Sequence, residues 1–306
     1  MNLCSKSQTK LYGLDEELNE LINLYNNSKL PNKILLSGEK GIGKCTLAYH
    51  LINYILSNNE ENPYNTNDLQ INTDNHSFKL IQNNSNPNFI LIDVNSEKKS
   101  IEINQIRSLI NNLNKSSFNS KPRFILIDNI EFLNVNSINA LLKILEEPNE
   151  NTYFILINNN KKILSTLLSR CLNFKISLSN EKVSLVNKLL FGDDIKNLIN
   201  SDILDYYHTP GKIYDILEFS KEKEIDLRDV NLKEFLSLII NGSYYKNDNR
   251  IKVILYNYLE LFLLKKISIT YFEIFSYFLK KINNVKKFNL NEESLFLEID
   301  TKLLNG

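Results

Sequence analysis

Several residue types are scarce or absent in this chain. It contains no tryptophan and one methionine, and it has three cysteines and three histidines among 306 residues. The cysteines, at positions 4, 45 and 171, are far apart and odd in number, so neither a disulfide framework nor a zinc site is expected. No apolar run reaches the length of about 18 residues that a membrane span needs, and the first residues lack the apolar stretch of a secretory signal. We therefore expect a soluble, cytoplasmic protein.

An excess of charge is also lacking. The 36 Lys and Arg residues balance 36 Asp and Glu residues. Without a global basic field, strong independent binding to nucleic acid is not expected. The length suggests two or three domains and is sufficient for a large hydrophobic core.

Glycine is scarce too, with eight residues, but three of them fall within six positions. The run reads Gly38-Glu39-Lys40-Gly41-Ile42-Gly43-Lys44-Cys45-Thr46. This is the P-loop pattern, in which backbone N–H groups and a helix N-terminus surround phosphates and the lysine reaches the β- and γ-phosphates. An apolar run at 34–37 predicts a strand before it, and apolar spacing at 46–56 predicts a helix after it. The sequence therefore predicts a site for ATP or ADP with Mg²⁺.

Cys45 departs from the P-loop pattern, which has Ser or Thr after the lysine. That hydroxyl normally holds Mg²⁺, whereas a thiol sulfur is a poor ligand for this hard cation. Thr46 comes one residue late and is expected to touch a phosphate at most. Nucleotide binding is thus expected at this loop, but efficient hydrolysis is not.

The pattern of elements predicts an α/β fold in the first half of the chain. Apolar runs at 34–37, 89–94, 124–128 and 153–157 predict buried strands, which alternate with helices at 14–25, 46–56, 101–113, 138–145 and 161–168. Such alternation is typical of a parallel sheet covered on both faces. The Asn-rich stretch 57–88 is expected to be irregular. After residue 179 only helical segments are expected, at 181–191, 194–204, 212–222, 232–240, 250–267, 270–282 and 293–304.

Asp128 follows a buried apolar run and is therefore typical of the strand-end carboxylate that holds Mg²⁺ in P-loop enzymes, usually through water. Hydrolysing enzymes of this type carry Glu at the next position, where this chain has Asn129, an amide that cannot accept a proton. Glu131 lies three positions beyond Asp128 and is expected to point elsewhere. Cys45 and Asn129 thus both argue against hydrolysis.

Two further motifs give the chain a specific resemblance. Residues 139–148 read NALLKILEEP, and residues 168–171 read LSRC. With the P-loop, they resemble the clamp-loader ATPase-fold subunits of bacterial DNA polymerase III. The resemblance implies a P-loop AAA+ module with a parallel sheet at 1–178, a helical lid at 179–224, and an all-α C-terminal collar domain at 225–306.

Within this family the chain is similar to the delta-prime type. Motor subunits, gamma or tau, normally keep Ser or Thr after the P-loop lysine, Asp-Glu on the later strand, and four zinc-binding cysteines between the two motifs. This chain has none of these features. Cys45 follows the lysine, Asn129 follows Asp128, and no cysteine lies between Thr46 and Phe124. A gamma/tau-like self-contained ATPase remains the alternative. A third hypothesis is a structural adaptor whose P-loop stays empty.

The resemblance implies a role for several residues. Arg170 matches an arginine finger that reaches the nucleotide of a neighbouring gamma subunit, so that this chain acts in catalysis only in trans. Asn158 matches the sensor 1 position, with Asn159 as the alternative register, and Lys212 matches the sensor 2 position. The implied partners are gamma/tau and delta subunits in a pentamer and, through that complex, the sliding clamp and primer–template DNA.

Overall fold

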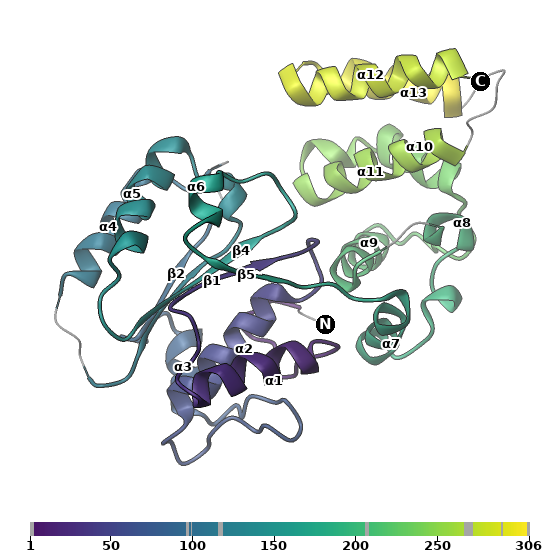
Figure 1. Ribbon diagram of the computed structural model, residues 1–306. Helices are drawn as coiled ribbons and strands as arrows, with labels where there is room; N and C mark the ends of the chain where they lie inside the picture. Colours follow the sequence, from purple (N-terminus) through teal and green to yellow (C-terminus); the bar gives the residue numbers. More distant parts are fainter. Residues whose placement is uncertain are drawn as a thin grey trace. The chain divides into compact units, whose positions relative to one another are not determined.

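The computed structural model describes residues 3–95, 98, 100–115, 119–205, 208–265, 272–288 and 290–304. The chain forms two compact units, Met1–Ser179 and Asn180–Gly306 (Figure 1). The first unit contains all five strands of the sheet, and the described part of the second is helical. Among the described residues, no helix combines the length and the apolar character needed to cross a membrane.

The first unit is built on a parallel sheet with the strand order β2-β3-β4-β1-β5. Its strands are β1 (Lys33–Ser37), β2 (Phe89–Ile92), β3 (Arg123–Ile127), β4 (Thr152–Asn158) and β5 (Leu172–Lys175). The first four confirm the predicted strands, because a strand inside a two-sided sheet is a continuous apolar run. β5 was not predicted: it lies at the edge of the sheet, and three of its four residues are exposed.

Helices cover both faces of this sheet. They are α1 (Asp15–Asn26), α2 (Lys44–Ser57), α3 (His76–Gln82), α4 (Ile103–Leu113), α5 (Val135–Glu146) and α6 (Ser165–Leu168), with a 3-10 turn at Ile130–Phe132. α4 and α5 lie on one face, and α1, α2 and α3 lie on the other (Figure 1). Alternate strand residues such as Ile125, Ile127 and Phe154 pack with Leu109 and Leu141 in one buried cluster. Because successive strand residues point to opposite sides, each apolar strand supplies buried side chains to both faces of the sheet.

The stretch 57–88 is more ordered than predicted, because it contains α3. Asn75 caps this helix by accepting a hydrogen bond from the backbone N–H of Phe78 at 2.8 Å. Ser77 donates its hydroxyl to the Glu60 carboxylate at 2.5 Å, and Lys121 reaches the same carboxylate at 3.2 Å. Polar side chains rather than a long apolar stripe organise this segment, which explains why no periodicity revealed it.

The described part of the second unit is helical, as predicted. Its α-helices are α7 (Asn180–Phe191), α8 (Ser201–Leu204), α9 (Pro210–Glu222), α10 (Leu232–Asn241), α11 (Asn249–Lys265), α12 (Phe272–Phe288) and α13 (Glu292–Ile299). Short 3-10 turns lie at Ile195–Asn197 and Tyr244–Lys246, and a π-helical turn lies at Asp300–Leu304. The single helix predicted at 194–204 is a 3-10 turn followed by α8, because Asn200 begins a new helix as its N-cap.

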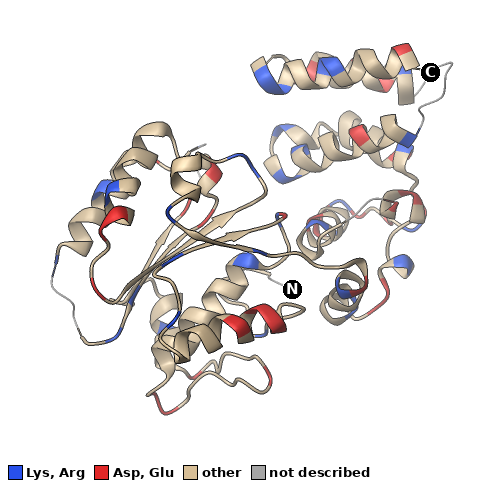
Figure 2. Ribbon diagram, viewed as in Figure 1, with Lys and Arg blue, Asp and Glu red and all other residues tan. Residues whose placement is uncertain are grey.

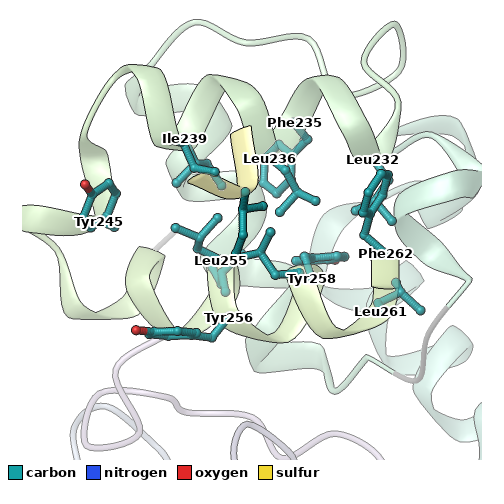
Figure 3. Packing of buried hydrophobic residues seen from close by; sticks show 14 of the residues in the cluster. Leu232, Phe235, Leu236, Ile239, Tyr245, Leu255, Tyr256, Tyr258, Leu261 and Phe262 are labelled. Carbon is teal, nitrogen blue, oxygen red and sulfur yellow. The ribbon is translucent and has the colours of Figure 1, made fainter. Parts of the chain in front are cut away.

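One buried cluster, from Ile199 to Leu304, forms the core of this unit. Phe235 and Leu236 of α10 face Leu255 and Tyr258 of α11 (Figure 3). Phe219 of α9 meets Phe235 edge-on, with the ring centroids 6.2 Å apart. The cluster therefore runs across residues 224 and 225, and the division into a lid and a collar stays a prediction. Basic and acidic residues are mixed along the ribbons of both units (Figure 2).

Candidate functional site

The P-loop connects β1 to α2 at the carboxyl edge of the sheet. Gly41 and Gly43 have φ of 87° and 96°, in the left-handed region where a side chain is strained. At Gly38 an added Cβ would lie 2.3 Å from the carbonyl oxygen of Ile176, so only glycine fits. All three glycines are therefore required by the backbone of this loop, which agrees with a cradle for phosphate.

Lys44 is buried at the first position of α2, and its amine is held inside the site. Its Nζ donates to the carbonyl oxygens of Gly38 at 2.9 Å and Glu39 at 2.6 Å, and to Oδ1 of Asn159 at 3.0 Å. Burial lowers the pKa of Lys44 to about 8, against the opposing effect of carboxylates that include Asp128 and Glu131. The amine is thus poised to exchange these neutral oxygens for a charged phosphate.

Asn159, and not Asn158, is the amide that the fold brings to Lys44. Asn158 ends β4 and turns its side chain to the loop, where it donates to the Lys161 carbonyl at 2.9 Å and accepts from the Lys161 N–H at 3.2 Å. Of the two registers considered for the sensor 1 position, Asn159 is the one that contacts Lys44, and the role itself stays a prediction. Successive residues of an extended chain point to opposite sides, so a shift of one position decides which amide faces the P-loop.

Asp128 lies just beyond β3, beside Cys45. Burial, followed by the charge of Asp93, raises the pKa of the Asp128 carboxyl to about 6, although a hydrogen bond with the Cys45 thiol acts in the other direction. Burial also raises the pKa of Cys45. Thr46 lies in the first turn of α2. The loop and Lys44 therefore fit a phosphate group, whereas a protonated thiol at position 45 fits Mg²⁺ poorly.

Glu131 was expected to point elsewhere, but its carboxylate belongs to the site. It accepts a hydrogen bond from Nδ2 of Asn159 at 2.9 Å. Asn129, at φ of 55°, starts the 3-10 turn and so redirects the chain after β3. Spacing along a continuing strand does not apply to Glu131, because the chain turns at Asn129 and brings Glu131 back to the site.

Asp93 is a member of the site that the sequence reasoning missed. Its Oδ1 accepts from Nδ2 of Asn129 at 2.8 Å, and Oδ1 of Asn129 accepts from Nδ2 of Asn159 at 2.8 Å. A chain of polar contacts therefore runs from Asp93 to Lys44 across the ends of β2, β3 and β4. The available signal was a carboxylate following an apolar strand, as at Asp128.

Arg170 follows the short helix α6 in the first unit. Its Nη1 donates to the Thr166 carbonyl at 2.8 Å, and its Nη2 donates to Oε1 of Glu146 at 2.6 Å. About a third of its side chain, 31%, is exposed. Arg170 is therefore partly accessible and already oriented by two elements.

Lys212 belongs to the second unit, in the first turn of α9. Thr209 caps this helix, and Pro210 occupies its first turn, as the Pro-Gly pair suggested. Among the described residues, no group of three or more His, Cys, Asp or Glu side chains is arranged to hold a metal ion.

Comparison with known proteins identifies a family for this chain. The family model described as "DNA polymerase III, delta subunit" matches residues 13–180, which is more than half of the chain. The chain belongs to this family.

Named relatives of the DNA polymerase III family agree with this membership. The subunit delta' of Buchnera aphidicola subsp. Schizaphis graminum is 27% identical over 289 residues, covering 87% of this chain and 83% of the relative. The subunit delta' of Buchnera aphidicola subsp. Baizongia pistaciae is 32% identical, covering 46% of this chain and 42% of the relative. The subunit gamma of Buchnera aphidicola subsp. Acyrthosiphon pisum is 29% identical, covering 73% and 63%. The chain spans less than two thirds of the last two relatives.

A solved structure shows the same fold. A DNA polymerase III gamma subunit-related protein from Thermotoga maritima aligns with a TM-score of 0.52 and 18% identity, over 91% of this chain and 96% of that protein. The predicted α/β fold class, a parallel sheet covered by helices and followed by a helical region, is thereby confirmed.

Proposed function

We propose that this chain is a delta-prime type subunit of the DNA polymerase III clamp loader, which helps to open the sliding clamp and place it on primed DNA. In this proposal it assembles with gamma/tau and delta subunits in a pentamer. Residues 1–178 form its AAA+ module, 179–224 its lid, and 225–306 its collar domain. It reaches the clamp and the primer–template DNA through the complex.

The observation that carries the proposal is the contrast between Arg170 and the chain's own P-loop. Arg170 is partly exposed and oriented, as a group that acts on another subunit's nucleotide requires. The chain's own loop has a half-buried cysteine at the Mg²⁺ position and an amide in place of the catalytic carboxylate. Little or no ATP hydrolysis is therefore expected here, and Arg170 supplies its charge in trans.

The remaining residues have subsidiary roles in this proposal. Gly38, Gly41, Gly43 and Lys44 surround a phosphate of ATP or ADP, and Asn159 holds the lysine. Mg²⁺, where present, is held by Asp128. Lys212 is proposed as the sensor 2 residue.

The test is the substitution Arg170→Ala in a reconstituted loader, with DNA-stimulated ATP turnover as the measurement. An arginine finger accelerates phosphoryl transfer by about 10³–10⁵-fold at the site that it serves. Turnover is therefore expected to fall strongly while the variant still folds and assembles. Arg107→Ala, which removes an exposed arginine of α4, is the matched control and is expected to leave turnover unchanged. Unchanged turnover with Arg170→Ala would overturn the proposal.

A gamma/tau-like ATPase is the second candidate, favoured by the position of Glu131 next to Asn159 and by the gamma relatives. ATP turnover by the isolated chain, lost on Lys44→Ala, would support it. Equilibrium titration with ATP and ADP separates both from an adaptor with an empty P-loop, which binds neither.

A further inference from the structure

The contact between Arg170 and Glu146 carries an inference that rests on the proposed function. Glu146 is the last residue of α5, where free carbonyl groups give the helix end a partial negative charge. A carboxylate is unfavourable at that position unless a cation offsets it. The guanidinium of Arg170 supplies that cation, 2.6 Å away.

The two residues are 24 positions apart, and each is fixed by its own element. Arg170 also donates through Nη1 to the Thr166 carbonyl within α6, so its two terminal nitrogens are held by two different helices. A long arginine side chain loses considerable rotamer freedom when it is fixed in this way. The two contacts settle that orientation before any partner binds.

Glu147 provides an internal comparison. It follows Glu146 directly, and no described residue lies within ion-pair distance of its carboxylate. The two neighbouring carboxylates thus have the same charge and nearly the same location, but only Glu146 contacts the arginine.

We propose that Glu146 is a positioning residue, which holds the Arg170 guanidinium in the orientation that it uses on a neighbouring subunit's phosphate. Because the arginine is oriented in advance, the entropy cost of fixing its side chain does not add to the free energy of the transition state. Glu146 itself touches no nucleotide.

The first experiment measures the contact in the isolated full-length chain. Phenylglyoxal reacts with the terminal nitrogens of arginine, so the contact with Glu146 has to open before Arg170 reacts. Mass spectrometry of Arg170 peptides is expected to show adduct formation roughly two- to fivefold faster in Glu146→Gln, in line with the small strength of a partly exposed ion pair. Glu147→Gln is expected to match the unsubstituted chain. Equal rates in both variants would overturn the inference.

The second experiment measures the consequence in the reconstituted loader. Glu146→Gln is expected to lower kcat of the DNA-stimulated ATPase several-fold with little change in KM, because the arginine acts in the transition state. Glu147→Gln is expected to change neither constant. A change in KM without a fall in kcat would overturn the inference. A rise in kcat would also overturn it, since it would mean that Glu146 restrains the arginine.

Arg170→Ala in the same assay separates the two proposals. If Arg170→Ala lowers turnover and Glu146→Gln does not, Arg170 acts in trans but Glu146 does not position it. If Arg170→Ala has no effect, the proposed function fails, and the phenylglyoxal rates still report whether the contact exists.

Discussion

Oδ1 of Asn159 lies 3.0 Å from Nζ of Lys44, although 115 positions separate the two residues. The contact joins the chain just after β4 to the first turn of α2. It also connects the lysine, through Asn159, with Asn129 and Glu131. The Lys44 ammonium group is therefore tied by hydrogen bonds to a polar network at the ends of β3 and β4.

The amine of Lys44 is expected to titrate near pH 8, because burial disfavours its charged form. Competitive acylation followed by mass spectrometry checks this, since only the neutral amine reacts. An ordinary exposed lysine in the same sample is expected to titrate near about 10.4. Asn159→Ala is expected to lower the midpoint for Lys44 further, because it removes a partner of the charged amine. Asn158→Ala is expected to leave it in place, and the reverse pattern would contradict the assignment of Asn159.

Asp128→Asn is expected to stabilise the chain at pH 7.5 and to have little effect near pH 4. The folded-state pKa of about 6 lies above the ordinary aspartate pKa of 3.8, so the folded state holds this proton more tightly than the unfolded state does. The contribution of Asp128 is thus fully present below about pH 4 and is lost as pH rises through 6. The expected gain at pH 7.5 is roughly 1–3 kcal/mol of unfolding free energy, measured by urea denaturation.

Asp226→Asn is the control of opposite sign. Hydrogen bonds with Arg228 lower the pKa of this exposed carboxyl to about 2. Its substitution is therefore expected to destabilise, if it has any effect, at neutral pH. A stabilisation by both variants would mean that the effect of Asp128→Asn is not electrostatic.

Gly38→Ala is expected to destabilise the first unit by more than about 2 kcal/mol. Its Cβ would lie 2.3 Å from the Ile176 carbonyl oxygen, which is part of the backbone and cannot turn aside. Gly192→Ala is the matched control, because at φ of 79° it meets backbone strain but no atom within 4 Å. It is expected to cost about 1 kcal/mol. Equal losses of unfolding free energy would mean that the close contact is absent.

Phe235→Ala is expected to destabilise the second unit by about 3–5 kcal/mol, because the ring is fully buried and its loss leaves a cavity. Leu238→Ala, on the same helix with 40% of its surface exposed, is expected to cost less than about 1 kcal/mol. Chemical denaturation followed by tyrosine fluorescence measures both. A similar small loss for both variants would contradict the packing of α10 against α9 and α11.

Much of the fold could be predicted from local sequence. β3 and β4 are continuous apolar runs because both of their faces are buried, and α10 is a helix with a clear apolar stripe. β5 could not be predicted in this way, since an exposed edge strand needs no apolar pattern. α3 is seven residues long and depends on the cap at Asn75, which leaves too little length for a periodic signal.

The site residues, like the elements of the fold, fall into those that local sequence predicts and those that it does not. Gly38, Lys44 and Asp128 belong to local motifs, and the structure places all three around one loop. Glu131 enters only because Asn129 takes a left-handed conformation, and Asn159 rather than Asn158 enters because of strand register. Both depend on where the chain turns after a strand, which spacing along the sequence does not specify.

The close approach of Gly38 to Ile176 has a mechanical consequence. The N–H of Gly38 donates to the Asn158 carbonyl, and the N–H of Ile176 donates to the carbonyl of Ser37, the residue before Gly38. The start of the phosphate loop is thus held from two sides and has no free space toward Ile176. Ile176 precedes the second unit by only a few residues. A rearrangement at the start of the phosphate loop would therefore have to break or strain hydrogen bonds to the residues that follow β4 and β5, which anchors this end of the loop to the sheet.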